Sequence, residues 1–266
     1  MSRSGAAGIL AAFALVAHGS IGDAQVRDAE VGDAAAETAA REALDTFITQ
    51  WNTAEDANLR RAMHFPFVTV PGGGALVIDN EPDDFSAGFD QMRASQGWNR
   101  SSFDFDSYRV VRSSPDKVHA EIGFSRYGAD GAAYMQSRVF YIVTKQDGRW
   151  GVKLRTSAAS PADLEPDERA EIVSAARQTV LDFFTAFNAG DTEGTVRTLN
   201  HPHLFMTATG GFSVAESAGD GPRPNFVQMR QGENWHMSTI DDLEASIVTR
   251  DKVHVELTFT RWHPDG

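Results

Sequence analysis

Four side chains between residues 98 and 126 have the types that bind an anion or close a ligand pocket, and each type recurs later in the chain. The first set is Trp98, Ser101, Asp104 and Arg126, and the second set, in the same order, is Trp235, Ser238, Asp241 and Arg261. Arg126 ends a strand face that is otherwise apolar, so its guanidinium could meet Asp104 or an anionic ligand. In the structural alternative, the tryptophan covers a core, the serine and aspartate cap a turn, and the arginine pairs internally. These eight residues are the first candidates for ligand binding.

His64 adds a general base to the candidates. An imidazole paired with a carboxylate can remove a proton from a substrate, and His64 or His119 with Asp104 could form such a pair. Alternation along the strand places His119 on the face opposite to the apolar one. The chain has no cysteine and no serine-centred nucleophile elbow. Two alternatives remain open: a binding or structural module without turnover, and a cofactor-free lyase or isomerase-like enzyme with Asp104 or His64 as its base.

No pattern in the sequence predicts a metal or a cofactor. His201 and His203 share one strand face, which is half of a metal site. No third ligand is evident, and the corresponding residues of the first repeat are Phe65 and Phe67. Residues 72–74 are three glycines that follow a strand without opening a helix, so we expect a turn and not a phosphate cradle. We expect neither metal nor cofactor.

The doubled side chains are part of a long internal repeat. Asn52 pairs with Asn188 at an offset of 136 (188 − 52), and the motif Asp-Lys-Val-His recurs at Asp116 and Asp251, an offset of 135 (251 − 116). Between them, the tryptophan, serine and aspartate candidates match at an offset of 137 (235 − 98). This period is longer than the roughly 20–50 residues of solenoid repeats. Each copy is therefore expected to be a whole domain.

Each copy begins with the pattern of an amphipathic helix. Apolar residues at i, i+3, i+4 and i+7 form one stripe in the first copy: Leu44, Phe47, Ile48 and Trp51. The same offset gives the stripe of the second copy: Val180, Phe183, Phe184 and Phe187. We expect a short second helix over residues 54–64 and 190–200, which Pro66 and Pro202 stop. A third short helix is expected over residues 85–95 and 225–231.

The remainder of the first copy has the composition of antiparallel strands. We expect strands over residues 104–111, 118–127, 134–144 and 150–157, joined by turns at residues 115–116, 130–131 and 147–148. Within the second strand, one face is apolar and is expected to meet the helices. His119 and Glu121 lie on the other face, where they form either a solvated pair or an interface between domains.

The N-terminus has the pattern of a secretory signal. Arg3 precedes an apolar run from Gly5 to Ala17, and Gly22-Asp23-Ala24 is a small-x-small cleavage site. The apolar run is shorter than the roughly 20 residues that span a bilayer. Since there is no cysteine to carry a lipid anchor, we expect a signal peptide over residues 1–24, cleaved near Ala24. The mature protein would then be exported to the periplasm or the medium without a membrane attachment.

Composition excludes one class of partner. The net charge is −13, with 24 basic and 37 acidic residues, whereas binding to a phosphate backbone needs a clustered basic face. We therefore expect no nucleic-acid partner. A length of 266 residues suits two domains of roughly 100–150 residues each.

Several motifs resemble those of the nuclear transport factor 2-like superfamily, a cone-shaped α+β fold shared by ketosteroid isomerases, polyketide cyclases and scytalone dehydratase. They are the helix ends TQWNTAED and TAFNAGD, the strand entries HFPFV and NHPHL, and the hairpin YIVTKQDGRWGVKLRTS. The resemblance covers Ala39 to Ser157 fully and Arg177 to Gly266 partly. It implies a ligand site at the open mouth of the cone. Ketosteroid isomerase chemistry is not implied, because it needs a helix tyrosine and all the tyrosines fall on expected strands: Tyr108, Tyr127, Tyr134 and Tyr141.

The expected architecture is α+β, with two tandem cone-shaped domains, each a curled antiparallel sheet packed on one long and two short helices. We expect a flexible leader over residues 25–38, a first domain over 39–157, a linker over 158–168 and a second domain over 169–266. The second copy lacks the last two strands, which would leave an open sheet edge. We expect the native chain to continue, and the alternative is that a partner or a second chain supplies these strands.

The expected partners follow from this architecture. A small apolar or weakly anionic molecule would occupy the mouth of the cone, either bound as a ligand or turned over by the base. A homodimer that pairs the outer faces of the sheets is a further possibility. In that case, association of the chains is the main role of the protein.

Overall fold

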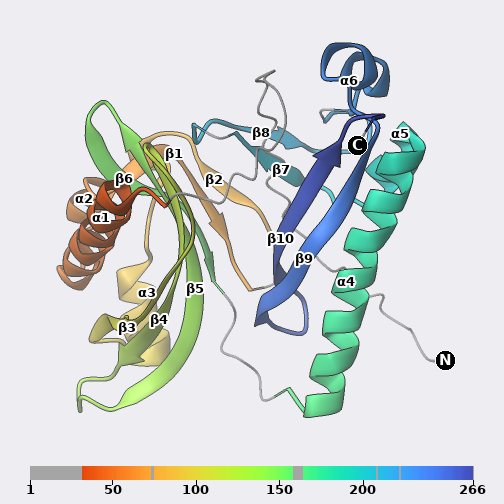
Figure 1. Ribbon diagram of the computed structural model, residues 1–266. Helices are drawn as coiled ribbons and strands as arrows, with labels where there is room; N and C mark the ends of the chain where they lie inside the picture. Colours follow the sequence, from red (N-terminus) through yellow and green to blue (C-terminus); the bar gives the residue numbers. More distant parts are fainter. Residues whose placement is uncertain (1–31, 73–74, 158–163, 208, 222, 266) are drawn as a thin grey trace. The chain divides into compact units, whose positions relative to one another are not determined.

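The structure is a computed structural model that describes residues 32–265 except 73–74, 158–163, 208 and 222 (Figure 1). The expected signal peptide lies outside the described residues. The described elements fall into two compact units, one from α1 to β6 and one from α4 to β10. None of the helices in the described part of the chain is long and apolar enough to cross a membrane.

The first unit begins with the long helix α1 (Ala34–Asn52), whose apolar stripe is buried against the sheet. The side chain of Asp33 caps the helix by accepting a hydrogen bond of 2.9 Å from the backbone N–H of Ala36. The helix thus starts inside the segment expected to be a flexible leader. The reason is composition, because a run of alanine has the highest helix propensity and Ala36 and Ala40 pack in the core.

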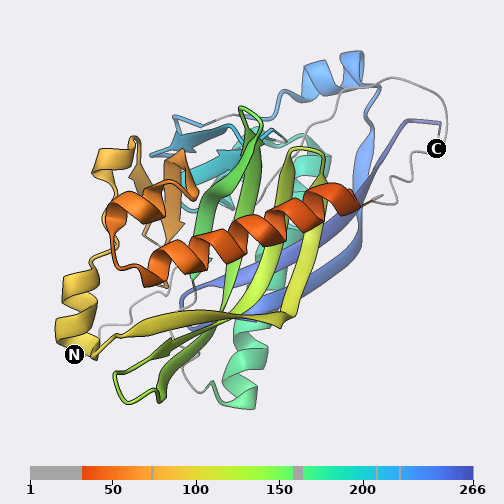
Figure 2. The ribbon, with the colours of Figure 1, turned by 90° about the vertical axis from the view of Figure 1, so that its left-hand side faces the viewer.

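The sheet of the first unit has six strands in the order β2-β1-β6-β5-β4-β3. Their bounds are β1 (Met63–Val70), β2 (Val77–Asp79), β3 (Arg100–Ser114), β4 (Lys117–Tyr127), β5 (Ala133–Gln146) and β6 (Arg149–Ser157). Helix α1 lies across one face of this curved sheet and contacts β3 and β6 (Figure 2). Neighbouring strands are antiparallel except β1 and β6, which pair in parallel. The expected all-antiparallel sheet differs at this pair because the two strands are far apart in sequence and no hairpin joins them.

The first unit has three short helical elements. Helix α2 (Asp56–Arg60) follows α1, and the 3-10 helix η1 (Pro82–Asp84) and helix α3 (Phe89–Gln96) follow β2. The second helix ends earlier than expected, and Pro66 lies within β1 after a cis peptide bond. Pairing of β1 with β6 is interrupted between Met63 and Val68, so a proline without an N–H fits there. Proline therefore marks an irregular strand entry and does not stop the helix.

Aromatic rings join the helix to the sheet in the first unit. Phe47 of α1 packs edge-on against Tyr141 at 5.8 Å and stacks with Phe103 at 6.5 Å between ring centroids. At the end of α1, Trp51 contacts Phe89 of α3 at 5.3 Å. Each such pair contributes about 0.5–1.5 kcal/mol beyond the area it buries. These contacts fix the end of α1 over the inner face of β3 and β5 and against α3.

The second unit repeats the order of elements of the first as far as its fourth strand. It contains α4 (Pro166–Ala189), α5 (Thr192–Arg197), β7 (His203–Met206), β8 (Phe212–Ala215), α6 (Phe226–Gly232), β9 (Met237–Val248) and β10 (Val253–Trp262). Helix α4 packs against β9 and β10 (Figure 1). The described strands form two separate two-stranded sheets, β7-β8 and β9-β10. In the first unit, β5 and β6 connect the corresponding pairs into one sheet.

Burial differs between the two cores at matching strand positions. Ala120 and Ile122 of β4 are fully buried, whereas the matching Val255 and Leu257 of β10 are only partly buried. Strand β4 has a paired neighbour on each side, while the described pairing of β10 is with β9. The matching positions are therefore more exposed in the second unit.

Candidate ligand-binding site

The doubled tryptophan and serine form a structural clamp at the end of α1. The indole N–H of Trp98 donates to the hydroxyl of Ser101 at 2.9 Å. The side chain of Asn52, the last residue of α1, donates to the carbonyl of Ser101 at 2.9 Å and accepts from its N–H at 2.8 Å. Trp98 and Ser101 are both buried. Their polar groups are paired with each other and are not directed at a ligand.

The second copy has the same clamp. Trp235 donates to the hydroxyl of Ser238 at 3.1 Å. Asn188 donates to the carbonyl of Ser238 and accepts from its N–H, both at 2.8 Å. The structural alternative therefore accounts for these four residues of the candidate set: Trp98, Ser101, Trp235 and Ser238.

The doubled aspartates lie on the surface. Asp104 is exposed, and its carboxylate accepts a hydrogen bond of 3.2 Å from the backbone N–H of Asp106. Phe103 and Phe105, on either side of it, pack in or against the core, and alternation turns the aspartate outward. Asp241 is also exposed and accepts from the hydroxyl of Thr260 at 2.6 Å. The expected pairing of Asp104 with Arg126 is absent among the described contacts, and the side chain of Asp104 is exposed to solvent.

Two arginines meet on the inner face of the first sheet. We call Arg126 of β4 and Arg155 of β6 the arginine pair. Both guanidinium carbons lie over the ring of Phe124, at 5.6 Å and 5.9 Å from its centroid. Arg155 also lies 5.5 Å from the ring centroid of Trp51, the buried tryptophan at the end of α1. The arginine pair therefore lies against the aromatic rings of Phe124 and Trp51.

Arg155 was not among the sequence candidates. Val152 belongs to the core, and strict alternation from it would place Arg155 on the outer face. The pairing of β5 with β6 shifts, however, so that Val143 pairs with Val152 and Tyr141 with Arg155. This irregularity turns Arg155 inward beside the core residue Tyr141. No local signal in the sequence announces such a bulge.

No carboxylate of the described residues forms an ion pair with the arginine pair. Arg126 donates instead to the neutral side-chain oxygen of Gln96 at 2.8 Å. Burial, followed by the charge of Arg155, lowers the pKa of Arg126, and Tyr134 and Tyr141 partly oppose this. The site therefore carries two positive charges without a protein counterion in the described part of the chain.

Three buried N–H donors around this site have no acceptor among the described residues: Nε1 of Trp51, Nε of Arg126 and Nε of Arg155. A buried donor without an acceptor costs about 1–3 kcal/mol. An acceptor-bearing ligand near the pair would remove this cost. Donors, positive charge and aromatic walls together suit a small molecule with an apolar body and an electron-rich polar end.

His64 lies at a different place. Its Nδ1 is 2.9 Å from the hydroxyl of Thr144, while their neighbours Met63 and Val143 face the core, so His64 lies on the outer side of the sheet. Burial, followed by the charges of Arg149 and Lys153, lowers its pKa to about 4. A hollow of about 440 Å³ adjoins it, lined by Arg60, Met63, His64, Phe65, Pro82, Gln146, Asp147 and Arg149. His64 and the arginine pair therefore cannot act on one substrate group.

The second copy neutralises its candidate arginine. Arg261 forms an ion pair of 2.8 Å with Glu233. The guanidinium is thus used within the protein. This is the internal pairing that the structural alternative describes.

The outer-face pair His119 and Glu121 is buried, so the solvated alternative is wrong. Glu121 is 2% exposed and forms ion pairs with Arg109 at 2.9 Å and Arg138 at 3.6 Å. The ring of His119 packs edge-on against Phe140 at 5.6 Å. Burial lowers the pKa of His119 to about 3, so the imidazole is neutral.

The histidines of the second copy do not form a metal site with other residues of the described chain. His203 is buried against Phe205, with 4.3 Å between ring centroids, and burial lowers its pKa to about 4. The ring of His201 is 6.5 Å away. In the ranges that the structure describes, no group of three or more metal-ligating side chains occurs.

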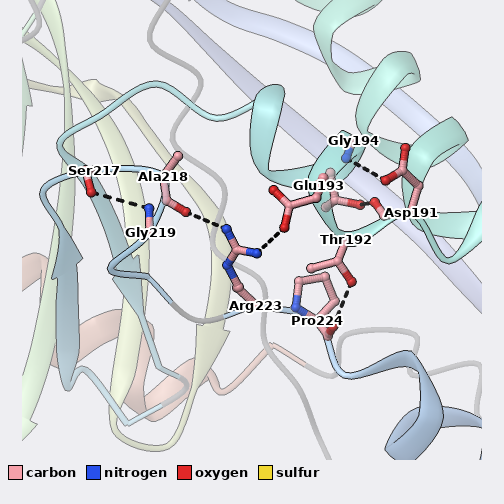
Figure 3. Close-up of polar contacts among 10 residues, drawn as sticks. Asp191, Thr192, Glu193, Gly194, Ser217, Ala218, Gly219, Arg223 and Pro224 are labelled. Carbon is pink, nitrogen blue, oxygen red and sulfur yellow. Dashed lines mark hydrogen bonds and ion pairs between the residues drawn. The ribbon is translucent and has the colours of Figure 1, made fainter.

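A second hollow, of about 410 Å³, lies beside α4 and α5 and is lined by Asp182, Thr185, Ala186, Ala189, Asp191, Gly194, Arg197 and Thr198. Polar groups there hold local structure. Asp191 caps α5 by accepting from the N–H of Gly194 at 2.8 Å. Nearby, Arg223 pairs with Glu193 and donates to the carbonyl of Ala218 at 3.0 Å (Figure 3). These contacts hold the loop before α6 in place, and Glu193 compensates the charge of Arg223.

Comparisons with known proteins found similarity to solved structures at low sequence identity. No protein-family model and no curated protein matches the chain. A solved protein of unknown function with a cystatin-like fold from Nostoc punctiforme is 16% identical, with a TM-score of 0.41, and the match covers 49% of this chain and 96% of that one. A nuclear transport factor 2-like protein of unknown function from Pseudomonas putida is 14% identical, with a TM-score of 0.41, covering 51% and 99%.

A ketosteroid isomerase-like protein from Erwinia carotovora atroseptica is 13% identical, with a TM-score of 0.36, covering 46% of this chain and 93% of that one. The descriptions of these proteins name the same superfamily that the sequence motifs resemble. The expected α+β class, with helices packed on a curled sheet, is confirmed by the helices and strands of this chain itself. The fold hosts many functions, so the function of this chain has to come from its own side chains.

Proposed function

We propose that the first unit binds a small, largely apolar molecule that carries a hydrogen-bond acceptor, without turning it over. The observation that carries this proposal is the set of three buried donors around the arginine pair that have no acceptor among the described residues: Trp51, Arg126 and Arg155. The rings of Trp51 and Phe124 flank the guanidinium groups and would contact the apolar body of the ligand.

The enzyme alternative has less support. Asp104 is exposed and its carboxylate caps a turn. His64 is neutral at pH 7, but a base whose pKa is about 4 is a weak proton acceptor at that pH. Neither side chain lies with the arginine pair on the inner face of the sheet.

Nuclear magnetic resonance of the full chain tests the proposal directly. The Nε–H signals of Arg126 and Arg155 can be assigned from their loss in Arg126→Gln and Arg155→Met. Titration with benzoate and with benzamide, which both carry an acceptor on an aromatic body, is expected to shift both signals in a saturable manner. If neither compound shifts either signal, the proposed function is wrong.

We also propose that the protein is exported and that the outer sheet faces pair two chains. The signal pattern of residues 1–24 supports export, and N-terminal sequencing of the secreted or periplasmic protein should begin after Ala24. Sedimentation equilibrium of the wild-type chain over a range of concentrations tests the pairing, and a monomer at every concentration would show that the proposed dimer is wrong.

A further inference from the structure

The matched arginines of the two copies have partners of different charge. Gln96 ends α3, and Glu233 follows α6 at the same offset of 137 (233 − 96) that relates Trp98 to Trp235. Gln96 accepts a hydrogen bond from Arg126, and Glu233 accepts one from the matching Arg261. The described part of the second copy has no counterpart of Arg155, which lies on β6, so the comparison between the copies concerns the partner of the first arginine alone.

The hydrogen-bond geometry is the same in both copies. Nη1 of Arg126 donates to Oε1 of Gln96 at 2.8 Å, and Nη1 of Arg261 donates to Oε2 of Glu233 at 2.8 Å. The glutamate cancels the charge of its arginine, whereas the glutamine accepts a hydrogen bond and cancels none. The first copy therefore keeps a full positive charge on Arg126 next to that on Arg155.

Two adjacent guanidinium groups without a counterion are unfavourable in a partly buried site. The chain carries 37 acidic residues against 24 basic ones, yet the described part of it places no carboxylate at the arginine pair. With such a net charge, attraction of a small anion depends on a local group of positive charges. A bound anion would supply the missing charge and accept from the three unpaired donors.

We propose that the ligand of the first unit is an organic carboxylate with an aromatic or aliphatic body, and that Gln96 is the residue that makes the site accept an anion. This inference rests on the proposed binding function and names the class of its ligand. In the second copy, Glu233 occupies the corresponding position and excludes anions from Arg261. Gln96 thus leaves the charge of Arg126 available to a ligand, whereas Glu233 gives Arg261 a structural role.

Isothermal titration calorimetry of the full chain, with benzoate and the uncharged benzamide at constant ionic strength, tests the inference. Wild type is expected to bind benzoate at least about tenfold more tightly than benzamide, since hydrogen bonds to a charged acceptor are stronger than those to a neutral one. In Gln96→Glu the new carboxylate pairs with Arg126, as Glu233 does with Arg261. This variant should lose about tenfold in benzoate affinity while its benzamide affinity stays within about twofold.

Matched variants separate charge from structure. Gln96→Ala removes the same hydrogen bond without adding a charge and should keep the preference for benzoate. Glu233→Gln makes the reciprocal change in the second copy and should leave benzoate affinity at the first unit unchanged. Far-ultraviolet circular dichroism and the thermal midpoint verify that each variant is folded.

The outcomes distinguish the two proposals. If wild type binds benzoate and benzamide equally well, or if Gln96→Glu binds benzoate as wild type does, the carboxylate inference is wrong while the binding function stands. If wild type binds neither compound, the binding function fails, and the inference fails with it. A loss of benzoate binding in Gln96→Ala equal to that in Gln96→Glu would also overturn the role of charge.

Discussion

Asn52 binds the backbone of Ser101 through two hydrogen bonds of 2.9 Å and 2.8 Å, and these bonds join the end of α1 to the start of β3. Asn188 binds Ser238 in the same way. The residues that the copies share most visibly therefore maintain the fold. The residues that differ between the copies, such as Gln96 and Glu233, are the ones that bear on function.

Replacing Asn52 by alanine should destabilise the first unit. The backbone N–H and carbonyl of buried Ser101 would lose their side-chain partner, at a cost of about 1–2 kcal/mol. Hydrogen exchange followed by mass spectrometry should show faster exchange in peptides of α1 and β3. In Asn188→Ala the faster exchange should appear in α4 and β9 instead, and an identical pattern in both variants would contradict the clamp.

Ser101→Ala should cost about 1–3 kcal/mol in the free energy of unfolding, because it leaves the indole N–H of Trp98 buried without an acceptor. Benzoate affinity is expected to stay at the wild-type value, since the serine faces the clamp and not the arginine pair. Ser102→Ala is the control, because its half-buried hydroxyl contacts the hydroxyl of Tyr127 at 3.1 Å and its loss should change stability by less than about 0.5 kcal/mol. Urea unfolding monitored by tryptophan fluorescence measures both.

Arg155→Met should abolish benzoate binding with little change in the stability of the free protein. The change removes a buried donor that lacks an acceptor among the described residues, worth about 1–3 kcal/mol, together with the repulsion from Arg126. It also removes the contacts with the rings of Trp51 and Phe124, worth about 0.5–1 kcal/mol each, and the hydrogen bond with buried Tyr141. The gains and losses are of similar size, so we expect the free energy of unfolding to change by less than about 1 kcal/mol. A larger loss of stability in urea would show that the charge is compensated inside the protein.

Stability should fall as the pH drops from about 6.5 to about 4, because burial lowers the pKa of His64 from 6.5 to about 4. In that window the unfolded chain binds a proton at this residue and the folded chain does not, so the contribution is fully present above pH 6.5. His203, with a pKa of about 4, acts in the same direction. His64→Gln should reduce the loss between pH 7 and pH 4.5 by about 2 kcal/mol, as measured by urea unfolding at each pH. An unchanged pH profile would show that His64 is accessible to protons in the folded state.

Local periodicity was enough to predict the helix of the first core. Leu44, Phe47 and Trp51 all lie on the buried stripe of α1, because a spacing of 3.6 residues per turn places them on one side. The outward position of Asp104 could also have been derived, since it lies between Phe103 and Phe105 on a strand. That alternation predicts an exposed side chain for Asp104 and not a pocket residue.

Other features had no local signal. The sequence suggested that Pro66 stops a helix, yet the structure places it in a strand whose partner, β6, lies far along the chain. The inward position of Arg155 is not predicted by alternation along the strand, because a bulge between β5 and β6 reverses the face on which it lies. Both results depend on which strands become neighbours and at what register.

The order of side-chain types along the chain determined the two long helices, the apolar face of β4 and the α+β class, because each of these follows from spacing over a few residues. Direct comparison of the copies gave the sequence repeat. Tertiary structure alone decided that Arg126 and Arg155, from two strands that are not neighbours in the sheet, lie over one phenylalanine ring. It also decided that a glutamine, and no acid of the described ranges, pairs with Arg126. The physical reason is that charge compensation depends on distances across a sheet. Those distances are fixed by long-range strand pairing and by a bulge, neither of which the residues themselves encode in their immediate neighbourhood.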